Sequence, residues 1–284
     1  MEGIARREGP DGTGAYLLRS DGSMQRIDNG TEVGGWAWSL DGRSLAYFSR
    51  PVGADASVPV SLWVMRTDGT ERRKLVDFPL GQGPKPRAPV WSPNSQRLAA
   101  MTAGSAGGPP GGAWIVEVAT GDARQVLTND ELDAIVWSPD SKRIATDPAT
   151  TTEQSNKTRT FEQNVVVVDP TTGARTDIAH NNDVAAWTPS GDIVMVSGLV
   201  TNDRGDEQPH RVPGLVRALS PDGQHLATES TDTFLVYDRN WCGRALVNIA
   251  DHTGPHWISW YGPSQILVIV NPHDGVDPSG LGWY

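Results

Sequence analysis

The sequence predicts an all-β fold, a six-bladed β-propeller of four-stranded antiparallel blades, from three observations. One pattern, Trp-Ser-Pro-Asp-Gly/Ser-x-x-Leu/Ile-Ala, recurs six times in close or degenerate form. The copies begin at Trp38, Trp91, Trp137, Trp187, Leu219 and Trp260. Their separations of 53, 46, 50, 32 and 41 residues, by subtraction, bracket the roughly 40–50 residues of a propeller blade. The chain is also rich in glycine (31) and proline (21), as many short strands joined by turns require.

Each copy of the pattern is expected to form the inner hairpin of a blade. Proline presets φ at the second turn position, the Asp or Asn side chain bonds to nearby backbone, and Gly accepts a positive φ. Apolar residues precede the turn and an alternating apolar run follows it, as in Ile135-Val136-Trp137 and Ile144-Ala145. This is the pattern of two antiparallel strands. On this reading Asp41, Asp140 and Asp222 are turn residues rather than members of a calcium site.

A second hairpin follows most copies and supplies the outer two strands of each blade. These hairpins are expected over residues 62–76, 113–127, 165–178 and 234–247. Residues 198–214 of the fourth repeat are polar, so its outer strands are expected to be stunted. Two hairpins per repeat give the four-stranded unit that propellers repeat radially.

The two ends of the chain are predicted to share the closing blade. The last repeat has two strands, within residues 256–270, and residues 15–27 form a hairpin that supplies the missing outer pair. Such sharing leaves no open edge on the ring. We therefore expect one propeller domain over residues 1–284.

Composition limits the classes of partner. The net charge of −10 would repel a polyanion, so nucleic acid is not expected as a partner. No apolar segment approaches 18 residues, so no membrane span is expected. The single cysteine, Cys242, excludes an internal disulfide and any cysteine-based metal site.

The repeat resembles that of the TolB-like propellers, also called WD40-like repeats, over nearly the whole chain. The resemblance implies a periplasmic or extracellular scaffold, a protein-binding platform, or the propeller part of a larger peptidase. Met1 as a native start would instead indicate the cytoplasm. No Gly-x-Ser-x-Gly nucleophile motif is present, because Ala103-Gly104-Ser105-Ala106-Gly107 lacks the leading glycine.

A ligand or protein partner is expected on the top face, around the channel mouth. Strand direction places on that face the connections between the second and third strands of each blade, which vary most in length, and those between blades. Variable loops on a rigid scaffold commonly carry binding. The candidate ligand-binding residues, all in connections that lead into inner strands, are Arg87, Asp133, His180, Asp183, His252 and His256.

The predicted activity is non-catalytic binding, with no cofactor. The alternative is a metal-assisted lyase or hydrolase with a His/Asp site at the mouth, because some TolB-like lyases hold a divalent metal with histidines. Imidazoles beside carboxylates would suit a divalent metal or an acidic ligand. Scattered polar loop histidines are the simpler interpretation of the same residues.

Overall fold

The computed structural model describes most of the chain and shows only β-strands, turns and loops in that part. The described residues are 3–9, 12–18, 21–27, 31–54, 58–78, 83–84, 88–103, 110–128, 132–153, 159–220, 222–230, 233–238, 240, 242–248, 256–260 and 266–270. Two compact units can be separated, residues 1–132 and 133–284. Within the described residues, nothing forms an apolar helix of membrane-spanning length.

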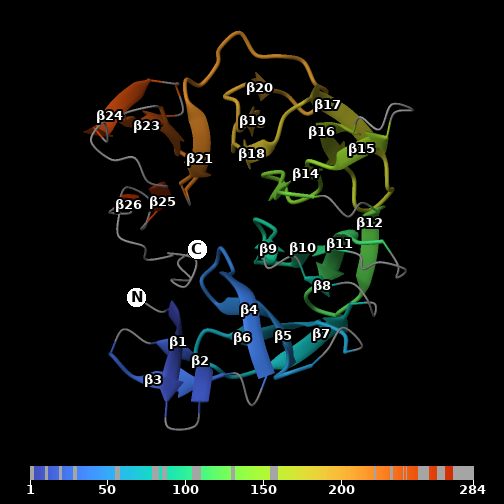
Figure 1. The fold of residues 1–284 in the computed structure, drawn as a ribbon, viewed down its shortest axis with the longest axis vertical. Helices are drawn as coiled ribbons and strands as arrows, with labels where there is room; N and C mark the ends of the chain where they lie inside the picture. Colours follow the sequence, from blue (N-terminus) through green and yellow to red (C-terminus); the bar gives the residue numbers. More distant parts are fainter. Residues whose placement is uncertain are drawn as a thin grey trace. The chain divides into compact units, whose positions relative to one another are not determined.

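The first unit contains three antiparallel sheets (Figure 1). One sheet has the order β1-β2-β3, with β1 (Gly3–Gly9), β2 (Gly12–Leu18) and β3 (Met24–Arg26). The next has the order β4-β5-β6-β7, with β4 (Thr31–Trp38), β5 (Ser44–Pro51), β6 (Ser61–Arg66) and β7 (Arg73–Asp77). In the third, β10 (Arg97–Ala103) pairs with β8 (Gly83–Pro84), β9 (Val90–Trp91) and β11 (Gly112–Glu117), and β11 pairs with β12 (Ala123–Thr128).

The second unit continues the same pattern. Its first sheet joins β13 (Ile135–Trp137), β14 (Ile144–Thr146), β15 (Ala149–Glu153), β16 (Arg159–Val168) and β17 (Arg175–His180). A three-stranded sheet follows, β18 (Val184–Trp187), β19 (Ile193–Met195) and β20 (Val200–Thr201). Next come β21 (Leu215–Leu219), β22 (His225–Glu229), β23 (Thr233–Asp238) and β24 (Gly243–Asn248), and then the pair β25 (His256–Trp260) and β26 (Ile266–Val270).

The six expected inner hairpins are all present. They are β4–β5, β9–β10, β13–β14, β18–β19, β21–β22 and β25–β26. The four outer hairpins are present as well: β6–β7, β11–β12, β16–β17 and β23–β24. The fourth repeat is stunted as expected, because β20 has two residues and ends its three-stranded sheet. The fold is therefore all-β, built from repeated antiparallel sheets.

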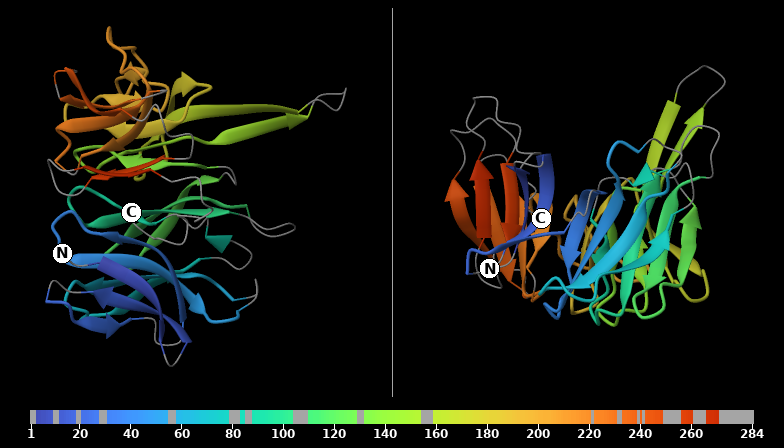
Figure 2. Two further views of the ribbon diagram at one scale, coloured as in Figure 1. Left: turned by 60° about the vertical axis from the view of Figure 1, so that its left-hand side comes forward. Right: turned by 90° about the horizontal axis from the view of Figure 1, so that it is seen from below.

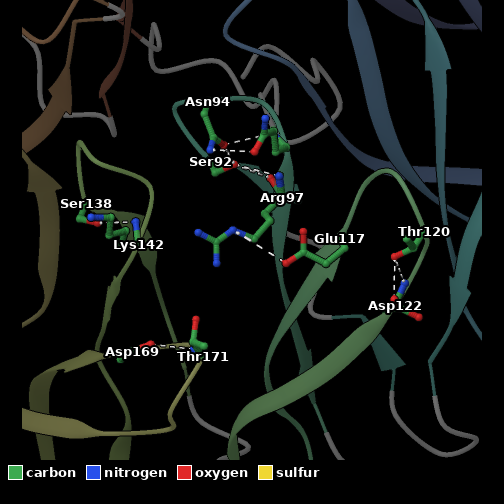
Figure 3. A network of polar contacts seen from close by, with 11 residues as sticks. Ser92, Asn94, Arg97, Glu117, Thr120, Asp122, Ser138, Lys142, Asp169 and Thr171 are labelled. Carbon is green, nitrogen blue, oxygen red and sulfur yellow. Dashed lines mark hydrogen bonds and ion pairs between the residues drawn. The ribbon is translucent and has the colours of Figure 1, made fainter.

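A buried hydroxyl organises the turn of five inner hairpins. In the third repeat the Ser138 hydroxyl donates to Asp140 Oδ1 at 2.7 Å and accepts from the Arg143 N–H at 2.9 Å. Figure 3 shows the matching turn at Ser92, Asn94 and Arg97, where the corresponding distances are 2.8 and 2.9 Å. The other turns centre on Ser39, Thr188 and Ser220. The hydroxyl connects the two ends of the turn, so it fixes the hairpin register.

The Gly or Ser at the fifth position of the pattern, which is the fourth residue of the turn, has a positive φ, as the sequence indicated. Glycine occupies it at Gly42 (φ 68°), and serine does so at Ser95 (φ 57°) and Ser141 (φ 62°). Glycine reaches this region without steric cost, whereas serine does not. The turn geometry therefore overrides local preference at the two serines.

Apolar faces of successive sheets pack on one another within each unit. In the first, a core cluster joins Phe48 and Leu62 with Phe78, Trp91 and Leu98, and so spans the second and third sheets. Trp91 donates its indole N–H to the Ala37 carbonyl of β4 at 2.9 Å. In the second unit, one cluster spans the sheets of β14 and β18, and another spans those of β18 and β21.

The tryptophans that end the inner strands occupy one position of the repeated pattern, which predicts that they are equivalent and buried. Trp91, Trp137 and Trp187 are buried, with 5–6% exposure. Trp38 differs: it is only partly buried, packing against the cluster of Leu17, Tyr47 and Met65.

Two details differ from the sequence-based expectation. Strand β1 was not predicted, because its sequence, Gly3-Ile4-Ala5-Arg6-Arg7-Glu8-Gly9, has little apolar alternation. It pairs with β2, whose other edge pairs with β3, so the hairpin expected over residues 15–27 is part of a three-stranded sheet. The shared closing blade is thus not confirmed.

The second difference is a long hairpin in the third repeat. No strands were predicted between the inner hairpin of the third repeat and its outer hairpin over residues 165–178, but Ala149–Glu153 pairs with Arg159–Gln163, the first half of β16. Figure 2 shows this hairpin extending beyond the rest of its sheet. The β-branched threonines at positions 150–152 favour extended backbone, which explains the strand.

Candidate functional site

A polar cavity of about 360 Å³ lies in the second unit, where three successive sheets present their connections. Its lining residues come from the middle of β16, the β17–β18 connection, the β19–β20 connection and the start of β21. They are Gln163, Asn181, Asn182, Asp183, Val196, Ser197 and Leu215. These connections belong to the face on which the sequence analysis placed a ligand.

Backbone hydrogen bonds hold the walls of this cavity together. The Asn182 N–H donates to the Gln163 carbonyl at 3.0 Å, and the Val196 N–H donates to the Asp183 carbonyl at 2.8 Å. The Val216 N–H donates to the Val196 carbonyl at 3.0 Å. Each bond joins two successive repeats or two connections of the same repeat, so the polar side chains project from a rigid backbone.

The buried carboxyl group of Asp147 lies beside this frame. Asp147 directly follows β14, is fully buried, and accepts at Oδ1 from the N–H groups of Asp133 (2.9 Å) and Ala134 (2.7 Å). Its Oδ2 has no hydrogen-bond partner among the described residues. The pKa of Asp147 is raised to about 6, chiefly because burial disfavours the charged form; the two N–H donors lower it in part, and the charges of Asp183 and Asp133 add to the rise.

The structure brings two of the predicted site residues, Asp133 and Asp183, to the surroundings of Asp147. Asp183 lines the cavity, and the Asp133 carboxylate accepts from Nε2 of the cavity residue Gln163 at 3.4 Å. His180 ends β17 and places Nδ1 3.0 Å from Asn164 Oδ1, and it is not a lining residue. His256 begins β25, of which the backbone is described, while Arg87 and His252 lie outside the described residues.

Asp147 and the amide residues of the cavity were not among the site residues predicted from the sequence. One feature of the sequence could have indicated Asp147. Its carboxyl group directly follows the strand Ile144-Ala145-Thr146, at a position where a side chain is expected to be buried. Gln163 precedes the outer hairpin predicted over residues 165–178, in a segment for which no strand was predicted. Its position became interpretable only with β16, which runs from the long hairpin into the sheet.

A divalent metal was the alternative cofactor. In the part of the chain that the structure describes, no three His, Cys, Asp or Glu side chains come together as metal ligands. The donor set at the cavity is one carboxylate, three carboxamides and one hydroxyl. Such a set suits hydrogen bonding to a polar ligand better than it suits a transition metal.

Comparison with known structures places the fold among the β-propellers. The propeller domain of the trilobed protease of Pyrococcus furiosus is similar with a TM-score of 0.59 and 11% identity, covering 87% of this chain and 79% of that one. TolB of Acinetobacter baumannii gives 0.50 and 14%, covering 86% and 62%. An oligogalacturonate lyase in complex with manganese gives 0.54 and 12%, covering 86% and 72%.

The repeat and these similarities together identify a TolB-like β-propeller fold. No protein-family model matches the chain. One relative, the uncharacterized peptidase YuxL of Bacillus subtilis, is 32% identical over a match of 109 residues that covers 31% of this chain and 15% of that protein. The chain also spans less than two thirds of TolB, so these comparisons establish the fold and not an activity.

Proposed function

We propose that this protein is a non-catalytic binding propeller of six blades that holds a small ligand or a segment of a protein partner on its top face. The six inner hairpins support the blade count. The sharing of one blade by the two terminal segments stays part of this proposal.

The polar cavity at residues 163, 181–183, 196–197 and 215 is the observation that carries the proposal. Its walls are connections between strands, fixed by backbone hydrogen bonds to three sheets, and its volume lies in the range of small-ligand pockets. Polar groups on a rigid frame bind with little loss of conformational entropy.

The experiment blocks the cavity and follows binding. Ser197 is exposed at the cavity wall, so S197W introduces a large side chain there without disturbing a buried position. A panel of sugars, short peptides and metabolites is screened by thermal shift against the wild type and S197W. A ligand that raises the Tm of the wild type only, and that is recovered chemically unchanged, is the expected result.

Two outcomes contradict the proposal. If every ligand stabilises S197W as strongly as the wild type, the cavity is not the binding site. If the recovered ligand is cleaved, or if activity follows added divalent metal, the protein is the metal-assisted lyase or hydrolase of the alternative hypothesis. Metal analysis of the purified protein accompanies the screen.

A further inference from the structure

The polar side chains of the cavity wall are grouped by the backbone bonds that hold the wall together. Of the described residues that line the cavity, five carry polar side chains: Gln163, Asn181, Asn182, Asp183 and Ser197. Residues 181–183 are consecutive in the β17–β18 connection, and the Asn182 N–H bond to the Gln163 carbonyl, 3.0 Å long, brings Gln163 beside them. The Val196 N–H bond to the Asp183 carbonyl, 2.8 Å long, likewise brings the neighbouring Ser197 close. One small molecule in the cavity can therefore meet several hydrogen-bonding groups at once.

The wall is rich in hydrogen-bond acceptors. Two of its carboxamides use an N–H group within the protein: Gln163 Nε2 donates to the Asp133 carboxylate at 3.4 Å, and Asn182 Nδ2 donates to the His180 carbonyl at 3.3 Å. Each of these side chains retains its amide oxygen, which has two lone pairs, as an acceptor. The Asp183 carboxylate has about four acceptor positions, so it can accept from a ligand in addition to any neighbour within the protein. A ligand with several closely spaced donors suits such a wall.

Hydroxyl groups on adjacent carbon atoms match this wall. Each hydroxyl group donates one hydrogen bond and can accept others, so a neighbouring pair presents two donors within a short distance. Successive N–H groups of an extended peptide point to opposite sides, so a peptide segment presents fewer donors to one small area. The Ser197 hydroxyl accepts from the Leu199 N–H at 3.4 Å and has its own hydrogen to donate to a ligand oxygen. Val196 and Leu215, which is 47% exposed, offer aliphatic surface to the C–H groups of such a ligand.

We infer that this cavity recognises a neutral polyhydroxylated ligand, such as an uncharged sugar with hydroxyl groups on adjacent carbons. Its hydroxyl groups donate to Gln163, Asn182 and Asp183, and one of its oxygens accepts from the serine hydroxyl. Its C–H groups contact the aliphatic side chains of the wall. The inference rests on the proposed binding function and specifies the ligand class of that same site.

Isothermal titration of the wild-type protein with matched sugars tests the role of the hydroxyl groups. The probes are the methyl glycosides of glucose, galactose and mannose, each with its monodeoxy counterparts, which lack one hydroxyl group, and its uronic acid counterpart, which carries a carboxylate. We expect at least one neutral sugar to bind. Removal of one hydroxyl group of an adjacent pair should weaken that binding about tenfold, as expected for one lost hydrogen bond.

Variants then locate the site. Q163L removes an acceptor of the wall and should weaken binding of the neutral sugar about tenfold. The matched control is Q96L, the same substitution at an exposed turn residue of the first unit that does not line the cavity. S197A, at an exposed position of the wall, should weaken binding by a similar factor. The S197A variant and the monodeoxy sugars keep the test informative if Q163L folds poorly.

Failure of the inference is distinguishable from failure of the proposed function. Equal binding of neutral and monodeoxy sugars, tighter binding of the uronic acids, equal behaviour of Q163L and Q96L, or no binding of any neutral sugar overturns the inference. In those cases a peptide or another metabolite that binds the wild type and not S197W would leave the binding function standing. If S197W abolishes the binding of no ligand of any class, the proposed function fails as well.

Discussion

Arg143 forms an ion pair with Asp203, and so joins the inner hairpin of the third repeat to the loop after β20 in the fourth. The same guanidinium lies 5.5 Å from the centre of the Trp187 ring, at the end of β18. The two contacts use different properties of arginine, its charge and its flat face. They couple successive sheets within the second unit.

Replacing Arg143 with alanine should lower the free energy of unfolding by about 1–2 kcal/mol, because a half-exposed ion pair and a cation–π contact are both lost. R143K keeps the charge and should recover part of the loss. Urea denaturation of both variants measures the difference. R175A, which breaks an exposed pair with Asp177, is the control and should cost no more than about 0.5 kcal/mol. Equal costs for R143A and R175A would contradict the coupling.

The turn hydroxyls should be more important for stability than their small size suggests. S138A removes a buried hydroxyl that accepts from the Lys142 and Arg143 N–H groups, and it should cost about 1–3 kcal/mol. T120A removes an exposed turn hydroxyl bonded to Asp122 and should cost less than about 0.5 kcal/mol. Thermal unfolding compares the two. A neutral S138A would mean that water replaces the hydroxyl.

The fourth turn position predicts a stabilising substitution. Ser95 has a φ of 57°, and its buried hydroxyl has no described hydrogen-bond partner, so S95G should raise the free energy of unfolding by about 0.5–1 kcal/mol. The reverse change at the same position of the first repeat, G42S, should lower it by a similar amount. A Cβ at Gly42 meets nothing within 4 Å, so that cost would come from the backbone alone. Chemical denaturation should give opposite signs, and matching signs would refute the prediction.

Asp147 predicts how stability depends on pH. Its pKa is raised in the folded state to about 6 from 3.8, so the folded protein binds the proton more tightly than the unfolded chain does. The stability that this tighter proton binding adds to the folded protein is therefore fully present below about pH 3.8 and is lost as the pH rises to about 6 and above. Relative to wild type, D147N should gain stability across this window, by an amount on the order of 2 kcal/mol. Parallel Tm-versus-pH curves for the two proteins would exclude this assignment.

The tryptophan at the end of an inner strand should differ in energetic importance between repeats. W91A should cost about 3–5 kcal/mol, because Trp91 is buried and its indole N–H bonds to the Ala37 carbonyl. W38A should cost clearly less, since Trp38 is only partly buried. Denaturant titration of the two variants measures the gap. A cost below about 1 kcal/mol for W91A would contradict its place in the core.

The prediction from sequence succeeded for the hairpins because their information is local. Pro, Asx and Gly or Ser at fixed positions define a turn, and apolar residues on both sides define the strands, so β13–β14 and its five counterparts could be located in advance. The stunted outer part of the fourth repeat, where β20 has two residues, followed in the same way from the polar composition of residues 198–214. β1 and the β15–β16 hairpin lacked such signals and were missed.

What the sequence alone determined is therefore the repeat, the all-β class and the positions of the turns, since each depends on residues within a few positions of one another. Tertiary structure alone decided which polar residues meet. The carboxyl groups of Asp133, Asp147 and Asp183 belong to three different connections, and only packing of the sheets brings their charges into range. The same packing turns His180 toward Asn164 and places Gln163 and Leu215 in one cavity wall. Contacts between residues far apart in sequence depend on the relative position of whole sheets, which no local pattern encodes.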